Sequence, residues 1–341
     1  MGKEEDQVKA LVTGGGGFIG AALSKQLQKD GYETASFSRS DYPELRQLGI
    51  KVVRGDLTDP EAVTRACAGK YIVFHVAAKA GVWGSYQEYY RPNVLGTQNV
   101  IKACMLQGVK YLIYTSSASV IFDGKNIEGE NETLPYPSRP MSHYTATKAL
   151  AEQYILNANS PALNTLSLRP HLVWGPGDNH IIPGLMKRAK SGKLKRIGKG
   201  KNLIDTIYID NCVSAHLCAA NAIKQNSQVA GKAYFITNGE PLPVWDFING
   251  ILKAACLPPV EKSISFKIAL IAAGSLESIY KTCAIKNEPY LTRFLVHELC
   301  TSHWFDMSAA RKQLGYVPKI STTDGFKQLA LWFCEQEPGK S

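Results

Sequence analysis

The sequence predicts an α/β protein with a doubly wound parallel sheet and a smaller C-terminal lobe. Three observations support this fold class. Short apolar runs rich in β-branched residues alternate with helical patterns over residues 1–170. A cluster of glycines directly follows the first apolar run. After Pro170 the loops lengthen and Gly, Pro and Lys become frequent, so residues 171–341 are expected to form mainly a second lobe, with some segments returning to the first domain.

The expected elements of the first domain follow one another in regular order. Strands are expected at residues 9–13, 33–38, 51–57, 71–78, 110–116 and 164–170, and helices from residue 21 to before Gly31 and at 59–69, 94–107 and 145–156. Apolar strands separated by helices are typical of a parallel sheet that is covered on both faces. A chain of 341 residues suits one large unit of this kind or two domains.

The composition is that of a globular protein with a sizeable core, because 45% of the residues are hydrophobic and 20% are charged. Lys and Arg number 39 against 29 Asp and Glu, which gives a net charge of +10. This balance favours anionic partners such as a phosphorylated cofactor, a carboxylate or a membrane surface. No module that reads nucleic acid is recognisable, so a nucleic-acid partner is not expected.

The eight cysteines form no C-x-x-C pair, and the first ten residues, MGKEEDQVKA, show no signal peptide. We therefore expect a cytoplasmic protein with reduced thiols, no disulfide and no metal site. The longest apolar stretch, residues 263–285, contains Lys267, Glu277 and Lys281. Its uncharged core is residues 268–276, which is too short to span a membrane.

The glycine run TGGGGFIG has the spacing Gly14-x-x-Gly17-x-x-Gly20 between a strand and a helix. In that position the first glycine permits a tight turn, the second lets a pyrophosphate approach the backbone, and the third lets the helix pack on the strand. The helix N-terminus, with Phe18 and Ile19, favours the negative charge. The motif predicts a Rossmann-type dinucleotide site; a glycine-rich turn without a ligand is the alternative.

The end of the second strand indicates which dinucleotide is bound. An NAD site usually places an acidic residue about 20 residues after the glycines, to hold the ribose hydroxyls. Here Ser38 and Arg39 occupy that place. Arg39 can stack on adenine and pair with a 2′-phosphate, so NADP(H) is expected over NAD(H). The alternative is that Arg39 is a solvated loop residue and that Asp41 supplies the acid.

Tyr144 and Lys148 stand four residues apart in a predicted helix and so share one face. The pKa of a free tyrosine is near 10, and a nearby ammonium together with a cationic nicotinamide is expected to lower it. The segment YTSSASV ends a strand with several hydroxyls, one of which can hold a substrate oxygen beside the tyrosine. Combined with the glycine motif, this set predicts proton transfer to or from the substrate.

Taken together, the motifs resemble those of the extended short-chain dehydrogenase/reductases over essentially the whole chain. TGGGGFIG, GDLTD, HVAA, NVLGTQN, YTSSASV, YTATK and LRPHLVWGPGD stand in that family's order and spacing. The resemblance implies that Tyr144 is the proton donor or acceptor, that Lys148 is its electrostatic partner and ribose ligand, and that Ser117 positions the carbonyl. It implies further cofactor contacts at Asp56, Leu57, Ala77, Ala78, Lys79, Asn93, Pro170 and His171. Alternatively, Asp56 and Asn93 only cap helices.

The substrate is expected to be bulky and apolar. Sugar-nucleotide members of the family carry an arginine where this chain has Ile204, followed by Asp205, and an isoleucine cannot bind a diphosphate. Expected pocket-wall residues are Trp83, Phe122, Met141, Trp174, Ile181 and Ile182. Further expected substrate contacts are Ser119, His143, His180 and Ile204. For each aromatic residue the alternative is an ordinary place in the core.

Residues 265–280 and 288–299 resemble the C-terminal region of the 3β-hydroxysteroid and sterol-4-carboxylate dehydrogenase branch. That resemblance implies a helical lid with peripheral membrane contact; a plain buried helix pair is the alternative. RPHLVWGPGDNHIIP and RIGKGKNLIDTIYIDN are especially similar to reductases of 2-alkyl-3-oxoalkanoates, which are β-keto acids with two long alkyl chains. A substrate carboxylate would be contacted by Lys79, His143, His171 or His180.

Three other functions stay open at this point. A steroid or sterol dehydrogenase shares the expected catalytic residues and differs only in pocket shape. A sugar-nucleotide epimerase or reductase is disfavoured by Ile204. A regulator that binds NADP without catalysis does not need Ser117, Tyr144 and Lys148 together. The resemblance also implies a homodimer, paired through the helices of NVLGTQNVIKA and TATKALAEQYI.

Overall fold

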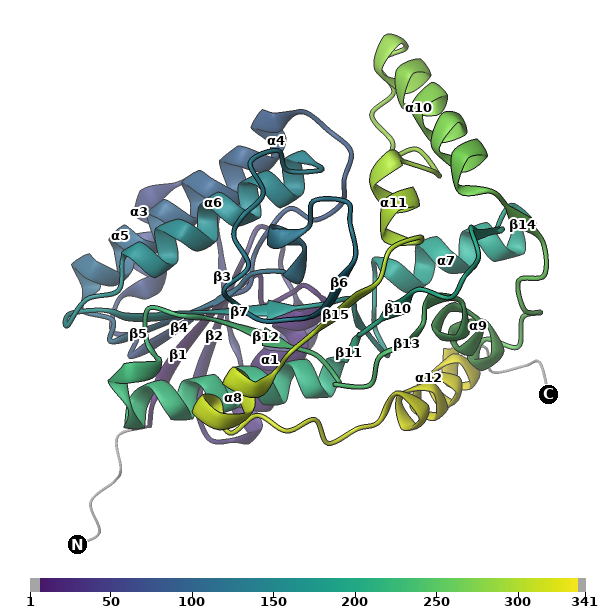
Figure 1. Ribbon diagram of the computed structural model, residues 1–341. Helices are drawn as coiled ribbons and strands as arrows, with labels where there is room; N and C mark the ends of the chain where they lie inside the picture. The colour runs from purple at the N-terminus through teal and green to yellow at the C-terminus, as the bar shows by residue number, and fades with distance from the viewer. Residues whose placement is uncertain (1–6, 337–341) are drawn as a thin grey trace, which may run out of the picture.

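The computed structural model describes residues 7–336. Residues 1–6, the first part of the segment in which no signal peptide is expected, and residues 337–341 lie outside the described part. The centre of the molecule is a seven-stranded sheet in the order β12-β7-β5-β4-β1-β2-β3, and every neighbouring pair is parallel (Figure 1). Its strands are β1 (Lys9–Thr13), β2 (Glu33–Ser38), β3 (Lys51–Arg54), β4 (Ile72–His75), β5 (Tyr111–Thr115), β7 (Asn164–Pro170) and β12 (Ala233–Ile236).

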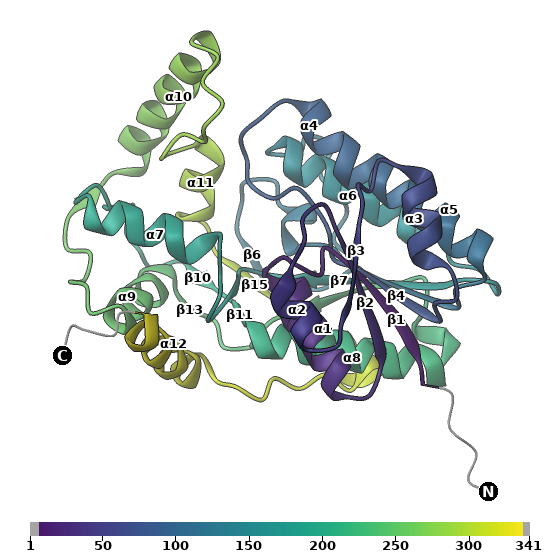
Figure 2. The ribbon, with the colours of Figure 1, turned by 180° about the vertical axis from the view of Figure 1, so that it is seen from behind.

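Helices cover both faces of this sheet, which confirms the predicted doubly wound class. One face carries α3 (Pro60–Cys67), α5 (Gly96–Gln107) and α6 (His143–Asn157). The other carries α1 (Phe18–Lys29) and α8 (Ile209–Gln225), and the short α2 (Pro43–Gln47) lies beside α1 in Figure 2. A strand order that runs outward from β1 in both directions leaves a crevice at the carboxyl ends of β1 and β4, where such sheets bind ligands.

The two-sided burial follows from the strand sequences. Neighbouring residues of a strand point to opposite faces. Leu11 belongs to the apolar core under α3, α5 and α6, whereas Val12 belongs to the core against α1 and α8. Val73 and Phe74 divide in the same way. A strand that is buried on both faces needs apolar residues at every position, which explains the continuous apolar runs in the sequence.

One expected helix is longer than its sequence pattern indicated. The helix was expected to begin near Val94, but the structure has a continuous helical run of α4 (Tyr86–Tyr90), a π-helical turn at Arg91–Leu95, and α5. Ser85 caps its start by accepting a hydrogen bond from the backbone N–H of Glu88. Pro92 normally ends a helix because it has no N–H, but the wider π turn accommodates it.

The second lobe is built mainly after residue 170. Its four-stranded sheet has the order β13 (Leu242–Pro243), β10 (Leu203–Ile204), β15 (His303–Phe305) and β6 (Ile127–Glu130). Around it lie the short strands β8 (Val173–Trp174), β9 (Arg196–Ile197), β11 (Ile207–Tyr208) and β14 (Ser263–Ile264), and the helices α7 (Ile181–Lys190), α9 (Val244–Ala254), α10 (Phe266–Thr282), α11 (Arg293–Glu298) and α12 (Thr322–Gln336). We propose a domain division near residue 170, with α8 and β12 returning to the first domain.

α10 projects away from the body of the molecule in both views (Figures 1 and 2). Within residues 7–336, no helix is long and apolar enough to cross a membrane.

Candidate active site

The glycine run forms the tight approach between β1 and the segment after β4. Gly14 has φ +69°, and its N–H donates to the Phe37 carbonyl at 2.8 Å. A side chain at Gly14 would begin 2.8 Å from the Ala77 Cα, and one at Gly20 would begin 2.1 Å from the Gly14 carbonyl oxygen. Both positions therefore require glycine.

The remaining glycines of the run also have close neighbours. A Cβ at Gly15 would meet the Ser36 hydroxyl, and one at Gly16 would meet the Tyr42 ring. Gly17 begins α1 without a side-chain cap, so the first N–H groups of the helix are left for a ligand. The cradle therefore fits a dinucleotide pyrophosphate, with Gly14, Gly17, Phe18, Ile19 and Gly20 around it.

A chain of hydrogen bonds ties the edges of this crevice together. The Ala77 N–H donates to the Thr13 hydroxyl at 3.3 Å, and that hydroxyl bonds the Nδ1 of His75 at 2.7 Å. The Nε2 of His75 bonds the Thr97 hydroxyl at 2.9 Å, and Thr97 donates to the Asn93 carbonyl. Because a carbonyl only accepts, Thr97 must accept from His75 Nε2–H, and Thr13 must donate to Nδ1. The network therefore requires a neutral imidazole.

The side chain of Asn93 joins two neighbouring segments. Its Oδ1 accepts from the Lys79 N–H at 2.7 Å, and its Nδ2 donates to the Lys79 carbonyl and to the Thr147 hydroxyl. Thr147 lies on α6 between Tyr144 and Lys148. Asn93 sits inside a helical run, so it does not cap its own helix. It fixes the loop that contains Ala78 and Lys79 against the helix that carries the tyrosine.

Asp56 does not cap α3 either. Its Oδ1 accepts from the N–H and the hydroxyl of Thr58, whereas Asp59 caps the helix. The backbone hydrogen bond from Thr58 lowers the pKa of Asp56, and the nearby charge of Arg39 contributes. Asp56 is exposed and the neighbouring Leu57 is buried against Gly96. The contact of both residues with adenine stays a prediction.

The residues that follow β2 differ in what they contact. The Ser38 hydroxyl accepts from the Gly16 N–H at 3.2 Å. Arg39 is exposed and makes no ion pair within residues 7–336. Asp41, the alternative ribose ligand, has its Oδ1 held by Arg46 at 2.8 Å and 3.1 Å and by the Tyr42 N–H. The free cation is therefore Arg39, and the acid is already paired.

Lys148 is enclosed at the carboxyl end of β5. Its Nζ donates to the Thr115 carbonyl at 2.6 Å and lies 4.2 Å from the centre of the Tyr114 ring. The Thr115 hydroxyl in turn bonds the Nε2 of His216 on α8 at 2.8 Å. Burial lowers the pKa of Lys148 to about 7, although the charge of Glu152 opposes this shift. The ammonium is therefore held in place by a carbonyl dipole and an aromatic face.

Tyr144 lies one helical turn before Lys148, beside Ser117. Lys148 does not lower the pKa of Tyr144 in this structure, and the expected contribution of a cationic nicotinamide stays a prediction. Burial raises that pKa, a hydrogen bond with Ser117 lowers it, and the charge of Glu298 raises it. The physical reason is that Lys148 is itself desolvated and directed at the Thr115 carbonyl. The phenol therefore stays protonated at neutral pH.

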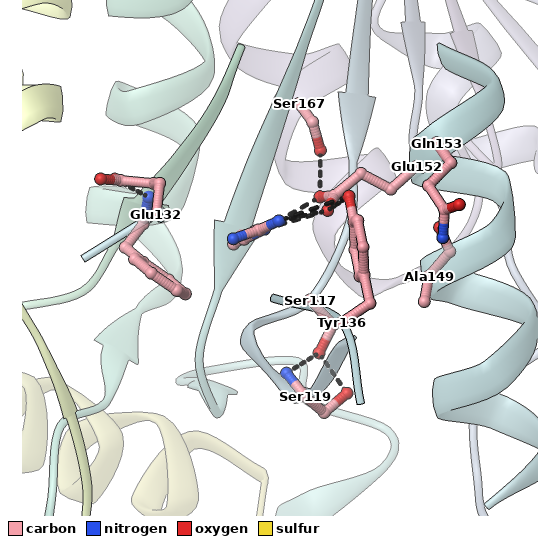
Figure 3. Close-up of polar contacts among 10 residues, drawn as sticks. Ser117, Ser119, Glu132, Tyr136, Ala149, Glu152, Gln153 and Ser167 are labelled. Carbon is pink, nitrogen blue, oxygen red and sulfur yellow. Dashed lines mark hydrogen bonds and ion pairs between the residues drawn. The ribbon is translucent and has the colours of Figure 1, made fainter. Parts of the chain in front are cut away.

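Ser117 is positioned by the turn that follows β5. Its hydroxyl lies 2.8 Å from the Ser119 hydroxyl and accepts from the Ser119 N–H at 3.2 Å (Figure 3). This contact caps the 3-10 turn at Ala118–Ile121. The structure therefore brings together Ser117, Ser119, Tyr144 and Lys148.

Behind these residues lies a buried ion pair that sequence reasoning missed. Glu152, one turn after Lys148, receives Arg169 at 2.7 Å, Ser167 at 2.7 Å and Tyr136 at 2.7 Å (Figure 3). Burial raises the pKa of Glu152, but Arg169 and the hydrogen bonds lower it more. The sequence signal was the position of Glu152 four residues after Lys148. By itself this spacing indicates only an exposed position on a helix.

Two of the four groups expected to contact a substrate carboxylate are already engaged in this structure. Lys79 pairs with Glu88 at 2.5 Å. The Nδ1 of His171 lies 2.5 Å from the Asp205 carbonyl, so it carries the proton and leaves Nε2 as an acceptor. Burial lowers the pKa of His171 to about 4, which keeps the ring neutral. His143 and His180 are exposed at the starts of α6 and α7.

Two expected substrate residues lie in the core instead. Trp174 has no exposed surface, and its indole N–H donates to the Thr206 hydroxyl at 3.0 Å. Ile204 is 1% exposed and pairs with His303 in the sheet of the second lobe. A side chain without open surface cannot line a pocket, so the alternative of an ordinary core position holds for Trp174, and Ile204 lies in the core as well. Two expected pocket-wall residues, Phe122 and Ile182, are also buried, at 2% and 3% exposed. Pro170 ends β7 beside His171.

Trp83 connects the two lobes over the crevice. Its indole N–H donates to the Ile285 carbonyl at 3.0 Å, and its ring meets Tyr280 edge-on at 6.0 Å. The neighbouring Val82 N–H reaches the Glu288 carboxylate at 3.4 Å. The segment between α10 and α11 is thereby joined to the loop after β4.

Comparison with known proteins agrees with this geometry. A family model described as the 3-beta hydroxysteroid dehydrogenase/isomerase family matches residues 11–268. The chain belongs to this family. It is 47% identical over 324 residues to a 2-alkyl-3-oxoalkanoate reductase of Stenotrophomonas maltophilia (strain K279a), covering 94% of this chain and 98% of the relative. It is 36% identical over 333 residues to the human decarboxylating sterol-4-alpha-carboxylate 3-dehydrogenase, covering 95% and 88%.

Among solved structures, MoeE5 in complex with UDP-glucuronic acid and NAD resembles this member of the 3-beta hydroxysteroid dehydrogenase/isomerase family. The TM-score is 0.73 at 24% identity, with 96% of this chain and 100% of that chain covered. At this identity the likeness shows the fold alone. The predicted family and branch are confirmed.

The buried histidines of this family member make its stability depend on pH. Burial lowers the pKa of His75 and His303 to about 3 and of His171 and His216 to about 4. In the unfolded chain these pKa values are near 6.5, so below that pH the unfolded state binds more protons. We expect these histidines to lower the melting temperature as the pH drops from 6.5 towards 4. Each histidine contributes up to about 1.4 kcal/mol per pH unit.

Thermal unfolding at pH 8, 7, 6 and 5 measures this dependence. His216→Gln should reduce the slope below pH 6.5, because it removes one of these titrations. His180→Gln, at an exposed position, is the matched control and should leave the slope unchanged. A melting temperature that stays constant down to pH 5 would contradict the prediction.

Proposed function

We propose that the protein is an NADP(H)-dependent oxidoreductase that interconverts the ketone and the secondary alcohol of a 2-alkyl-3-oxoalkanoate. The observation that carries the proposal is the convergence of Ser117, Tyr144 and Lys148 at the carboxyl end of β5, beside the glycine cradle. The names of the relatives in Stenotrophomonas maltophilia and in Shewanella oneidensis, the latter 44% identical, support the substrate class.

Each of the three converging residues has a separate role in the proposed reaction. Ser117, oriented by Ser119, donates a hydrogen bond to the substrate oxygen. Tyr144 gives its phenolic proton to that oxygen during reduction and takes it back during oxidation. A pKa raised by burial keeps Tyr144 protonated, which suits the reductive direction. Lys148 is held at the Thr115 carbonyl, one turn from the phenol. The dinucleotide, when bound, supplies or accepts the hydride.

Apolar side chains lie beside the turn at Ala118–Ile121, which supports an apolar substrate. Met141 is half-buried and lies against Gly124, whereas Phe122 is buried and packs edge-on against Phe294 of α11 at 6.0 Å. No cation stands at Ile204, so a sugar diphosphate lacks a ligand there. A sterol-4-carboxylate dehydrogenase is the second candidate, favoured by the relatives at 36% identity.

The first test measures NADP⁺ reduction with a 2-alkyl-3-hydroxy fatty acid beside a 3β-hydroxysteroid. We expect turnover with the fatty acid. Tyr144→Phe should lower kcat by at least about a thousandfold and leave NADPH affinity unchanged, because only the transferred proton is removed. Tyr154→Phe, at an exposed site on the same helix, is the control.

The result separates the candidate functions. Near-normal turnover by Tyr144→Phe would contradict the role of the phenol. Turnover of the steroid alone would move the protein to the sterol candidate. Absence of turnover with both substrates would favour a sugar-nucleotide enzyme or a regulator.

We propose that NADP(H) is preferred over NAD(H), supported by the unpaired Arg39 and by the pairing of Asp41 with Arg46. We expect tighter binding of NADPH than of NADH, measured by titration of the coenzyme fluorescence. Arg39→Ala should weaken NADPH binding about tenfold, through loss of a charged hydrogen bond, and leave NADH unchanged. Arg65→Ala is the control, since Arg65 pairs with Glu61 on α3. Tighter binding of NADH to the unmodified protein would overturn the preference.

We propose that α10 contacts a membrane surface. Its inner face is buried at Ala269, Ala273 and Glu277, whereas its outer face exposes Ile268, Ile271 and Ile279 by 58%, 71% and 54%. Lysines at both ends, Lys267 and Lys281, can reach anionic headgroups.

Co-sedimentation with vesicles that contain anionic lipid tests the contact. The protein should sediment with the vesicles, and Ile271→Glu should reduce the bound fraction several-fold by placing a charge on the apolar face. Leu331→Glu changes an equally exposed residue of α12 and should have no effect. Failure of the unmodified protein to bind would refute this contact.

We further propose a cytoplasmic homodimer paired through α5 and α6, whose outer surfaces expose Leu106 and Tyr154.

A further inference from the structure

The second lobe brings a carboxyl group near Tyr144. Glu298 is the last residue of α11. The preceding His297 lies with its Nδ1 3.2 Å from the Gly124 carbonyl, and Phe294 packs on Phe122. After α11 the chain enters β15, which pairs with β6 (Figure 1). These contacts hold the end of α11 against the segment that follows Ser117, and Glu298 lies near enough to Tyr144 for its charge to act on the phenol.

Glu298 has no partner of its own. Within residues 7–336 its carboxyl group makes no hydrogen bond and no ion pair, and the residue is only half-buried. In this it differs from Glu277 on α10, which is held by Arg293 at 2.8 Å. A half-buried carboxyl group without a partner is available for a ligand.

The titratable groups around this position offer no free cation. Tyr144 faces it from α6 and His297 precedes it on α11, with its Nδ1 engaged. The rings of His171 and His303 lie behind at 5.7 Å from each other, and burial lowers the pKa of both, which keeps them neutral. Burial raises the pKa of Glu298 to about 7. The carboxyl group is therefore largely protonated below neutral pH.

The substrate class proposed above brings a second carboxyl group next to the reacting carbon. Of the four groups expected to contact it, Lys79 is paired with Glu88 and His171 offers only an acceptor nitrogen, whereas His143 and His180 are exposed at the starts of α6 and α7. Resting on that proposed function, we propose that Glu298 binds the substrate carboxylate, the two carboxyl groups sharing one proton in a hydrogen bond. Two carboxyl groups held close together cannot both ionise without repulsion, so one of them keeps its proton.

This arrangement predicts a pH-dependent KM. Below pH 7 Glu298 donates its proton to the substrate carboxylate in a charge-assisted hydrogen bond, which contributes about tenfold or more to affinity. Above pH 7 Glu298 ionises and repels the substrate. Proton transfer at the neighbouring carbon belongs to Tyr144, so kcat should change much less than KM. A substrate without a carboxyl group should not respond to Glu298.

The test compares a 2-alkyl-3-hydroxy fatty acid with the secondary alcohol of the same chains that lacks the carboxyl group. KM is measured from pH 6 to 8.5 for the unmodified protein, Glu298→Gln and Glu298→Met. Glutamine keeps a donor that cannot ionise, whereas methionine has similar length and no such donor. Glu288→Gln, which removes a carboxyl group from the same lobe, is the control. NADPH binding of each variant verifies that it is folded.

For the unmodified protein we expect the KM of the acid to rise about tenfold across this range, and for Glu298→Gln we expect a level KM. Glu298→Met should show an acid KM about tenfold higher at pH 6, with the alcohol unchanged. An equal pH response in Glu298→Gln would overturn the proposal. A normal KM of Glu298→Met for the acid at pH 6 would also overturn the proposal. Glu298 would then affect the substrate only by repelling it when ionised. Turnover of the alcohol but never of the acid would instead refute the substrate class.

Discussion

The neutral imidazole of His75 is the interaction on which the geometry of the crevice depends. It accepts from Thr13 at the end of β1 and donates to Thr97 behind the π turn, so one ring fixes three segments at the carboxyl edge of the sheet. Thr13 in turn accepts from Ala77, the residue that Gly14 closely approaches. Burial lowers the pKa of His75 to about 3, which keeps both ring nitrogens in their roles at any physiological pH. The glycine cradle and the helix that carries Tyr144 are aligned through this ring and Asn93.

The catalytic end of the crevice is built from buried charges that are satisfied in different ways. Glu152 and Arg169 neutralise each other and share further hydrogen bonds, so neither acts on the substrate directly. Lys148 has only a carbonyl and an aromatic face, and burial therefore lowers its pKa to about 7. Glu298 has no partner in the described chain, and its pKa rises to the same value. The ionisable groups nearest the reacting atoms thus have the fewest charge and hydrogen-bond partners, as is common at sites where protons are transferred.

Much of this could be read from the sequence because it depends on local pattern. The doubly wound sheet followed from apolar strands alternating with helices, and the cradle from glycines at fixed spacing between a strand and a helix. The Tyr144–Lys148 pair followed from helical periodicity. The remaining features depend on contacts between distant segments: the π turn that accommodates Pro92, the partnership of Glu152 with Arg169, and the enclosure of Trp174 among second-lobe aromatics. The identity of a tryptophan or a glutamate does not show whether its side chain lines a pocket or is buried in the core.

The charges of the molecule also show why composition is a poor guide to the crevice. The chain carries a net charge of +10, which by itself suggests that an anionic substrate meets a lysine or a histidine. Near the tyrosine, however, Lys79 is paired with Glu88, and His171 is neutral with only an acceptor nitrogen to offer. The excess positive charge includes exposed side chains such as Arg39 and the lysines Lys267 and Lys281 of α10. The sign of the net charge therefore does not show which charges lie next to the tyrosine.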